Sequence, residues 1–313
     1  MGVTIGIDVG GTKIAAGVVD ESGAIVARTR RDTPSTDPEA IIHNIVTVID
    51  ELRAGREVDG VGVGSAGFVD AARSTVMFAP NLAWRDVPVR EQVSSATGLH
   101  VVVENDANAA AWGEFRFGAA EDVNDMVCVT VGTGVGGGVV VDGRLYRGAH
   151  GIGGELGHVR IVPNGHLCGC GNRGCVEQYA SGRALIREAR ELAHADSVFA
   201  TRMLEMAGGD PEAITGPMVT RAAQEGDQPA GELIADLGRW LGEALASFAA
   251  ILDPAVFVIG GGVSEAGELL LDPAASAYHR NLTGRGYRPE AEIRIATLGN
   301  DAGIVGAADL ARR

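Results

Sequence analysis

The sequence predicts an α/β protein built from two related halves, and two observations support this prediction. Apolar runs typical of strands alternate with segments whose apolar residues recur at helical spacing, as in residues 38–52. A glycine-rich turn between two strands occurs twice, first at residues 8–13 (DVGGTK) and again at 132–137 (GTGVGG). Because each turn opens a meander of three strands, the second half of the chain repeats the plan of the first.

The first half is expected to hold strands and helices in alternation after its opening meander. Its predicted strands are 3–9, 14–20, 24–30, 58–63 and 99–103, and its predicted helices are 38–52, 89–97 and 106–117. We expect these elements to form a small N-terminal α/β lobe over residues 1–118.

The second half is expected to form a larger α/β lobe over residues 119–300. Its predicted strands are 126–131, 138–141, 144–146, 255–259 and 292–296, with a loop-rich insert at 148–177 and helices through about residue 252 and from about residue 266. A final helix, 301–313, begins near Asp301, an acid suited to a helix N-terminus. This helix is expected to pack on the first lobe.

The composition excludes several classes of protein. Apolar residues make up 46% of the 313-residue chain and charged residues 21%, as in ordinary globular proteins. A net charge of −15 without a basic stripe argues against nucleic-acid binding. No run of 18 apolar residues and no basic leader before the first strand are present, so we expect neither a membrane span nor a secretory signal, and a cytoplasmic location.

The turn at residues 8–13 has the composition of a phosphate-binding hairpin. It is not a Walker A loop, because a predicted strand rather than a helix follows it. Gly10 and Gly11 would let backbone N–H groups approach phosphate oxygens, and Thr12 and Lys13 add donors. Lys13 is the only lysine in the chain, which makes its place in this turn more informative. The alternative is a tight β-turn whose glycines supply positive φ angles.

Asp8 stands at the tip of the strand before this hairpin, where it could hold Mg²⁺ directly or through water. The second turn, with Gly132, Thr133 and Gly134, occupies the equivalent place in the second half, so a phosphate chain could be held from both sides. Gly261 and Gly262 follow another strand and would be a third nucleotide contact, although a run of three glycines alone is a weak signal.

Three cysteines and a histidine have the spacing of a zinc site. Cys168, Cys170 and Cys175 lie within eight residues, and His158 lies ten residues upstream, which together can supply a tetrahedral Cys3His set. His166 is a rival fourth ligand on spacing alone. A disulfide is a poor alternative, because the compartment is expected to be reducing and a third cysteine would be left over. A site with four protein ligands is closed, so the metal would be structural.

Glu155, His158 and Glu177 flank this cluster at both ends. Carboxylates and an imidazole suit a polyhydroxylated ligand, whose hydroxyls both donate and accept hydrogen bonds. Each acid taken alone would be read as a solvated surface charge. The clustering around a metal-bound loop favours a functional role instead.

Asn105 and Asp106 follow a buried strand and open an alanine-rich helix. Ligands of α/β folds bind beyond the carboxyl ends of strands. A phosphotransferase needs a carboxylate to accept the proton of the attacking hydroxyl, and Asp106 is the acid placed for that role. The alternative is that Asp106 is only the N-cap of the helix.

Taken together, these motifs resemble the ROK family (repressors, open reading frames, kinases). The resemblance rests on DVGGTK at 8–13, Asn105-Asp106, GTGVGGG at 132–138, GELGH at 154–158 and CGCGNRGCVE at 168–177. It covers essentially the whole chain, and within the family the sequence is similar to bacterial zinc-containing glucokinases. The fold that the resemblance implies is the actin-like ATPase, or ribonuclease H-like, fold, with two lobes around a cleft.

The resemblance also implies roles for individual residues. Asp106 would be the catalytic base, phosphorylation of the glucose 6-hydroxyl by ATP would be the reaction, and Mg²⁺ and structural Zn²⁺ would be the metals. His158 would ligate zinc through one ring nitrogen and the sugar through the other. The implied sugar contacts are Gly67, Asn81, Asn105, Asp106, Glu155, His158 and Glu177, and the implied ATP contacts are Thr12, Lys13, Thr133 and the neighbouring glycines. For Gly67, close packing is an equally good explanation.

Other members of the family set the alternatives. Kinases of N-acetylmannosamine, N-acetylglucosamine, fructose, mannose or allose share most of these motifs. Sugar-sensing repressors carry a helix-turn-helix before the first strand, and we do not expect one here because the hairpin begins within the first ten residues. A homodimer or homotetramer is expected, because such assemblies are usual in these families.

Overall fold

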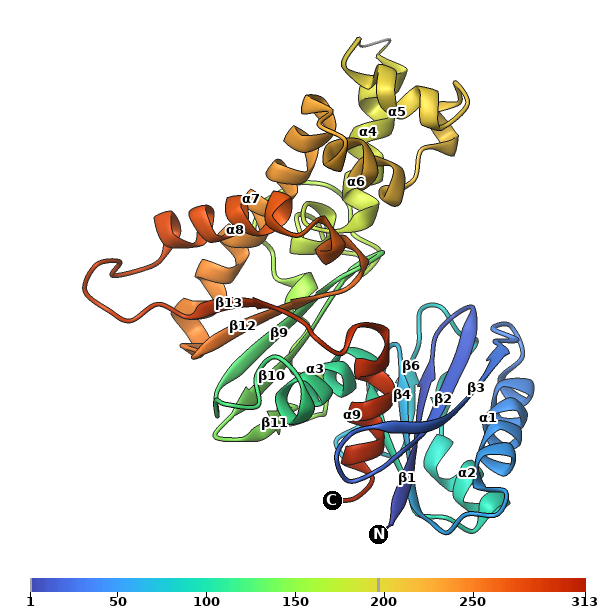
Figure 1. Ribbon diagram of the computed structural model, residues 1–313. Helices are drawn as coiled ribbons and strands as arrows, with labels where there is room; N and C mark the ends of the chain where they lie inside the picture. Colours follow the sequence, from blue (N-terminus) through green and yellow to red (C-terminus); the bar gives the residue numbers. More distant parts are fainter. Residues whose placement is uncertain (1, 196–197) are drawn as a thin grey trace. The chain divides into compact units, whose positions relative to one another are not determined.

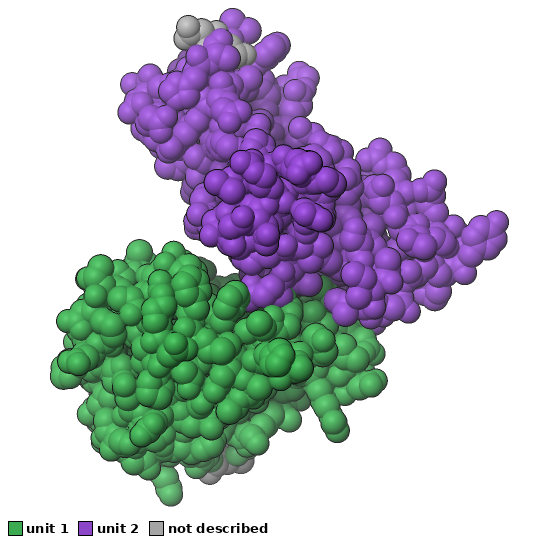
Figure 2. Space-filling view, turned by 180° about the vertical axis from the view of Figure 1, so that it is seen from behind, with its two compact units in different colours: residues 1–128, 137–154, 296–313 green, residues 129–136, 155–295 purple. Residues whose placement is uncertain are grey.

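The computed structural model describes residues 2–195 and 198–313. The chain divides into two compact units, drawn in different colours in Figure 2. One unit contains residues up to 128, 137–154 and 296–313, and the other contains 129–136 and 155–295. The lobes expected at 1–118 and 119–300 stay a prediction.

The first sheet has the strand order β3-β2-β1-β4-β8. Its strands are β1 (Val3–Val9), β2 (Lys13–Val19), β3 (Ile25–Asp32), β4 (Val58–Ser65) and β8 (Val101–Asn105). The first three form an antiparallel meander, and β4 and β8 then continue the sheet parallel to β1. This topology places the carboxyl ends of β1, β4 and β8 along a single edge.

Two pairs of helices cover this sheet (Figure 1). Helix α1 (Pro38–Arg53) packs with α2 (Val89–Thr97), and α3 (Asp106–Phe117) packs with α9 (Ala302–Leu310). Asp37 caps α1 by accepting hydrogen bonds from the N–H groups of Glu39 and Ala40. Helix α9 also contacts β1 and β4.

Glycines in the sheet allow α9 to approach it closely. A Cβ atom on Gly62 would lie 1.8 Å from the carbonyl oxygen of Ala307, and one on Gly6 would lie 1.8 Å from that of Ile304. No side chain fits at either position, so these glycines set the distance between the helix and β1 and β4.

A small antiparallel sheet, β5-β6-β7, was not expected from the sequence. Its strands are β5 (Phe68–Val69), β6 (Val76–Phe78) and β7 (Arg85–Val87), which are too short to show an alternating pattern. They matter for the site because the segments between them carry Arg73 and Asn81.

The second sheet has the order β11-β10-β9-β12-β13. Its strands are β9 (Met126–Val131), β10 (Val135–Val141), β11 (Arg144–Tyr146), β12 (Val256–Gly260) and β13 (Glu292–Ile295). As in the first sheet, the third strand of a meander lies at one edge of the sheet, its first strand lies in the centre, and two later strands continue the sheet from there. The shared order is what the expected repetition predicts.

Within its described residues, the second unit adds five α-helices and most of the loop-rich insert, residues 155–177. The helices are α4 (Gly182–His194), α5 (Thr201–Met206), α6 (Gly216–Gln224), α7 (Gln228–Leu252) and α8 (Glu268–Asn281). The insert at 148–177 contains only one-turn 3₁₀ helices, such as Leu156–His158, as expected from its glycines. Among the described residues, no helix has the length and apolar character needed to cross a bilayer.

Three boundaries differ from the expected ones in ways that bear on the site. Strand β8 continues through Asn105 because its last residues pair with Gly64 and Ser65 of β4. Strand β10 begins at Val135 rather than 138, since its glycines remain in the sheet. Helix α9 begins at Ala302, after a 3₁₀ turn over Gly299–Asp301.

Replacing Gly62 by alanine tests the close packing of α9. We expect Gly62→Ala to lower the free energy of unfolding by about 2–3 kcal/mol, because the new methyl group overlaps a backbone carbonyl. Gly231→Ala is the matched control: it lies in α7 with open space around its Cα and should be neutral or stabilising by about 1 kcal/mol. Denaturant melts of both variants compare them, and equal stability would contradict the packing argument.

Candidate active site

The strand register brings Asp8 and Asp106 to the same edge of the first sheet. Asp8 of β1 pairs with Gly64 of β4, and Gly64 pairs in turn with Glu104 of β8. Asp106 follows Glu104 by two residues, at the first position of α3. The two aspartates interact electrostatically. Asp8 lies near the carboxyl end of β1, and Asp106 lies just beyond the carboxyl end of β8.

The turn at residues 8–13 is a β-hairpin between β1 and β2, as the sequence predicts. Gly10 N–H donates to the carbonyl oxygen of Lys13 at 3.0 Å, and the Thr33 hydroxyl donates to that of Gly10 at 2.8 Å. Neither Gly10 nor Gly11 has a positive φ, so backbone conformation does not explain why glycine occupies these two positions. Gly11 instead lies against Asn81, whose Cβ would be 3.1 Å from an added Cβ. The implied sugar contact Asn81 therefore lies beside the hairpin.

Asp106 is not the N-cap of α3, contrary to the alternative weighed for it. Asn105 is the N-cap, and its side-chain oxygen accepts the N–H of Asn108 at 2.9 Å. The Asn105 amide donates to Asp106 Oδ1 and to the carbonyl oxygen of Gly67, both at 3.1 Å. Asn105 therefore both caps the helix and holds the Asp106 carboxylate in place.

Both aspartates hold protons more tightly than ordinary carboxyls. Burial raises the pKa of Asp106, and hydrogen bonds from the N–H of Ala107 and from the Asn105 amide oppose this in part. Burial and the charge of Asp106 raise the pKa of Asp8 to about 6, while Lys13 acts in the opposite direction. A buried carboxyl with a raised pKa is the kind of group that serves as a base or gains a metal ion.

Gly67 has a structural explanation that favours packing. Its φ is 114°, and an added Cβ would lie 2.1 Å from the carbonyl oxygen of Phe78. The sequence left sugar approach and packing open for this residue, and the geometry accounts for the glycine through packing alone. Its carbonyl still contributes to the site, because it accepts the Asn105 amide.

The second glycine-rich turn lies at the N-terminus of α4. The carbonyl oxygen of Gly132 accepts the N–H of Gly182 at 2.8 Å, and that of Thr133 accepts the N–H of Arg183 at 3.3 Å. The third turn adjoins it, since an added Cβ on Gly261 would lie 2.5 Å from the carbonyl oxygen of Val131. Two of the predicted phosphate turns are therefore brought together within the second unit.

A cavity of about 590 Å³ opens beside these two turns. Gly132, Thr133 and Gly262 form one part of its wall, and apolar side chains from α4 and α6 form another. This volume suits a nucleoside-sized ligand. The remaining lining residues are Gly182, Arg183, Leu185, Ile186, Gly216, Pro217, Thr220, Arg221, Gln224, Val263 and Glu265.

The four predicted zinc ligands converge. The ligand atoms of His158, Cys168, Cys170 and Cys175 all lie within 4.8 Å of one another. A tetrahedral zinc with ordinary bond lengths sets its ligands about 3.8 Å apart for two sulfurs and about 3.6 Å for sulfur and nitrogen. Cys170 and Cys175 Sγ are 3.7 Å apart, and Cys168 Sγ is 3.6 Å from His158 Nδ1. The cluster therefore fits a structural zinc ion.

Charge considerations also favour a metal in this cluster. Burial and the neighbouring thiols raise the pKa of Cys175 to about 12. Three thiolates at this spacing would repel one another strongly, and a divalent cation compensates them. The rival ligand His166 does not join the cluster; its ring packs at a tilt of 48° against Tyr179, with the ring centres 5.3 Å apart.

The two ring nitrogens of His158 face different partners. Nδ1 lies on the cysteine side, and Nε2 lies 4.0 Å from a carboxylate oxygen of Glu155. Glu177 connects the zinc loop to the second glycine-rich turn, since its carboxylate accepts the N–H of Val135 at 3.3 Å and lies 3.8 Å from Cys168 Sγ. The three residues expected to contact hydroxyls thus adjoin the metal cluster within one unit.

Sequence reasoning missed two parts of this arrangement. Glu104 is almost fully buried and pairs with Arg147 and Arg73, but a lone glutamate at a strand end gives no signal of its partners. The cavity residues of α4 and α6, including Arg183 and Thr220, are scattered along the chain. The start of α4 at Ser181-Gly182 was a usable signal, because helix N-termini are suited to anions.

Comparison with known proteins identifies the family. The model of the ROK family matches residues 4–313. The chain belongs to the ROK family. The actin-like ATPase fold that the motifs implied is therefore the fold of this chain.

Several known proteins are similar to this chain over almost their full length. A glucokinase of Streptomyces coelicolor is 50% identical over 312 residues, covering 100% of this chain and 98% of that protein. A ROK family glucokinase from Streptomyces griseus, crystallised in complex with glucose and AMPPNP, matches with a TM-score of 0.90 and 50% identity over 99% of both chains. An N-acetylmannosamine kinase of Salmonella typhi is 35% identical over 317 residues, covering 99% of this chain and 98% of that protein.

Removal of one cysteine tests the zinc cluster. We expect Cys170→Ala to lower the zinc content, measured by elemental analysis, from about one ion per chain to near zero, because a tetrahedral structural site loses one of four ligands. Cys128→Ala is the control: Cys128 is buried in β9, outside the cluster, and its replacement should leave the zinc content unchanged. Stoichiometric zinc in Cys170→Ala would contradict the assignment.

The raised pKa of Asp8 predicts a pH-dependent gain in stability on removing its charge. Its pKa rises on folding from 3.8 to about 6, so in the absence of divalent cations folding is penalised as pH rises through this window, by about 3 kcal/mol above it. Asp8→Asn should therefore raise the free energy of unfolding at pH 8 by up to about 3 kcal/mol. Below pH 4 the gain should vanish, and a gain independent of pH would contradict the assigned pKa.

Proposed function

We propose that this protein is a glucokinase that transfers the γ-phosphoryl group of ATP to the 6-hydroxyl of glucose. The observation that carries the proposal is the pair of buried aspartates at one edge of the first sheet, beside a glycine-rich hairpin. The family's glucokinases at 50% identity and the glucose and AMPPNP bound by one of them support this choice of substrates.

We assign the role of general base to Asp106. The 6-hydroxyl oxygen forms a bond to the γ-phosphorus as the bond from that phosphorus to the β,γ-bridging oxygen breaks, and the hydroxyl proton passes to the Asp106 carboxylate. Burial raises the pKa of Asp106, which makes its carboxylate a better proton acceptor. The Asn105 amide fixes Oδ1, which directs the carboxylate and leaves Oδ2 for the substrate.

Phosphate binding is assigned to the glycine-rich turns. The hairpin with Gly10, Gly11, Thr12 and Lys13 would contact the phosphates, as would the turn with Gly132, Thr133 and Gly134. The nucleoside would occupy the cavity bounded by Thr133 and Gly262. Mg²⁺ would neutralise phosphate charge, with Asp8 as its anchor on the protein.

Sugar recognition is assigned to five polar residues. They are Asn81, Asn105, Glu155, His158 and Glu177, which the family resemblance implies as sugar contacts. The zinc cluster would orient His158, because Nδ1 is taken by the metal and only Nε2 is left for a hydroxyl. Zinc binding and sugar binding are then coupled through one imidazole.

The cellular setting follows from the proposed chemistry. We propose a cytoplasmic location, where ATP is available and the cysteines of the cluster stay reduced. We also propose a homodimer or homotetramer, which light scattering on the purified protein tests directly.

Loss of the Asp106 carboxylate tests the catalytic assignment. We expect Asp106→Asn to lower kcat by 10²–10⁴-fold with little change in melting temperature, because proton acceptance by a positioned base contributes this much. Asp86→Asn is the control: Asp86 is exposed with a φ of 52°, a conformation asparagine tolerates, and its replacement should leave kcat unchanged. Near-normal turnover of Asp106→Asn would refute the assignment.

A substrate panel tests the choice of sugar. With ATP as donor, kcat/KM should be highest for glucose among glucose, mannose, fructose, N-acetylglucosamine and N-acetylmannosamine. A preference for an N-acetylated sugar would place the protein with the N-acetylmannosamine kinases of the family instead. The result of the panel does not bear on the role of Asp106, so the sugar substrate and the catalytic base are tested separately.

A further inference from the structure

Arg183 is a charged residue of the nucleotide cavity that contacts the second glycine-rich turn directly. Its Nε donates to the carbonyl oxygen of Thr133 at 3.3 Å, and its backbone N–H donates to the same oxygen. Its Nη2 lies 3.7 Å from the position that a Cβ atom on Gly134 would take. The guanidinium therefore lies against the turn, on the wall of the cavity.

The turn itself offers backbone donors to an anion. Its three carbonyl oxygens, those of Gly132, Thr133 and Gly134, all accept backbone hydrogen bonds, which fix the orientation of the turn. Within the described part of the chain, the N–H groups of Thr133 and Gly134 donate to no acceptor. Two adjacent free N–H groups in a fixed turn can bind an anion together.

Helix α4, which begins beside the turn, adds its dipole but no free backbone donor. The N–H groups of Gly182 and Arg183 donate to the turn, and those of Ala184 and Leu185 donate to the hydroxyl and the carbonyl oxygen of Ser181. The first four N–H groups of α4 are therefore all engaged. Free donors at this end of the helix are the Nη atoms of Arg183, which form no hydrogen bond within residues 2–195 and 198–313.

The charge of Arg183 is not compensated by a neighbouring acid. Glu265 lines the same cavity and Glu177 contacts the turn, but neither forms an ion pair with Arg183 among the described residues. Arg221, the other arginine of the cavity, pairs with Glu225 at 3.0 Å. A guanidinium with free Nη atoms is suited to phosphate oxygens, which it can bind through two parallel hydrogen bonds.

We propose that Arg183 binds the α- and β-phosphates of the nucleotide together with the free N–H groups of the turn. This inference rests on the proposed function, because it takes ATP as the ligand of the cavity. The cavity extends from the turn along α4 and α6, so the guanidinium faces the nucleoside and the phosphates next to it rather than the transferred γ-phosphate. Arg183 contributes affinity for the nucleotide and takes no part in the transfer itself.

Calorimetric titration of the full-length protein with ADP and with adenosine tests this role. Arg183→Ala should weaken ADP binding by about tenfold or more, the contribution of one hydrogen bond to a charged group, and should leave adenosine binding within about twofold of the wild type. Arg183→Lys keeps the charge but not the forked donors, so its ADP affinity should be intermediate. Both variants retain the backbone N–H that anchors the turn at Thr133.

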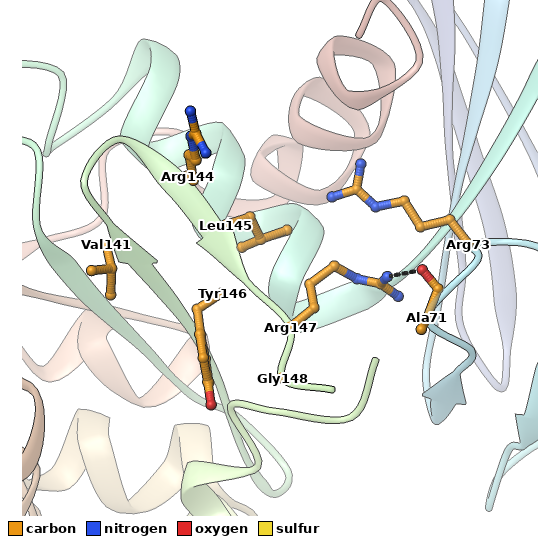
Figure 3. A pocket seen from close by; sticks show the side chains of 8 residues that line it. All are labelled: Ala71, Arg73, Val141, Arg144, Leu145, Tyr146, Arg147 and Gly148. Atoms are coloured by element: carbon orange, nitrogen blue, oxygen red, sulfur yellow. Dashed lines mark hydrogen bonds between the residues drawn. The ribbon is translucent and has the colours of Figure 1, made fainter. Parts of the chain in front are cut away.

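Arg144→Ala is the matched control. Like Arg183, Arg144 is exposed, and it forms no ion pair or side-chain hydrogen bond within the described ranges 2–195 and 198–313. It lines a different cavity, at β11, where its side chain points away from Arg73 and Arg147 (Figure 3). Its removal should change the affinity for neither ADP nor adenosine.

Steady-state kinetics provide a second readout. In Arg183→Ala, KM for ATP should rise by about tenfold or more, while KM for glucose should stay within about twofold of the wild type. Equal ADP affinity in the wild type and Arg183→Ala would overturn the role of Arg183 alone. An equal loss of ADP and adenosine affinity would also overturn it, because the guanidinium would then contact the nucleoside. Absence of ADP binding to the wild type would overturn the proposed function as well.

Discussion

The structure depends on placing two aspartates together at the carboxyl edge of one buried sheet. Asp8 lies near the end of β1 and Asp106 directly follows β8, the register aligns these two strand ends on either side of β4, and burial raises the pKa of both aspartates. Buried like charges are unfavourable unless a proton, a cation or hydrogen bonds compensate them. Neighbouring groups provide this compensation: the Lys13 ammonium acts on Asp8, and the Asn105 amide and the Ala107 N–H donate hydrogen bonds to Asp106.

This constraint explains why so many glycines occur around the site. Gly64 lies between Asp8 and Glu104 in the sheet, and Gly62 on the same strand lets α9 pack against it. Close packing excludes water from the strand ends, which maintains the raised pKa values. The zinc cluster supplies rigidity in a different way, because residues 155–177 have almost no regular structure of their own. A metal with four protein ligands fixes His158 and Glu177 where a sheet cannot.

Much of this arrangement could be predicted from the sequence, for reasons that differ between residues. The glycine-rich hairpin and the cysteine spacing are local patterns, and local patterns can be recognised in a sequence without knowledge of the fold. The helix starting at Asp106 was predicted at its observed bounds. The alternative that Asp106 is only its N-cap was wrong, because Asn and Asp are equally good caps and the backbone conformation gives that place to Asn105. Gly67 appeared as a site residue, although its positive φ and the adjacent Phe78 carbonyl explain it.

What escaped prediction depends on contacts between distant segments. Glu104 meets Arg147 across 43 residues of sequence, and the nucleotide cavity gathers residues from 132 to 265.

The central claim is that Asp106 is the base and Asp8 the anchor of the cation, and carboxyl ¹³C titration by NMR tests it most directly. It should give Asp8 a pKa near 6 that falls on adding Mg²⁺ with a non-hydrolysable ATP analogue, and Asp106 a raised pKa that Asp8→Asn lowers. Ordinary pKa values for both carboxyls, unaffected by Mg²⁺ and nucleotide, would contradict the account.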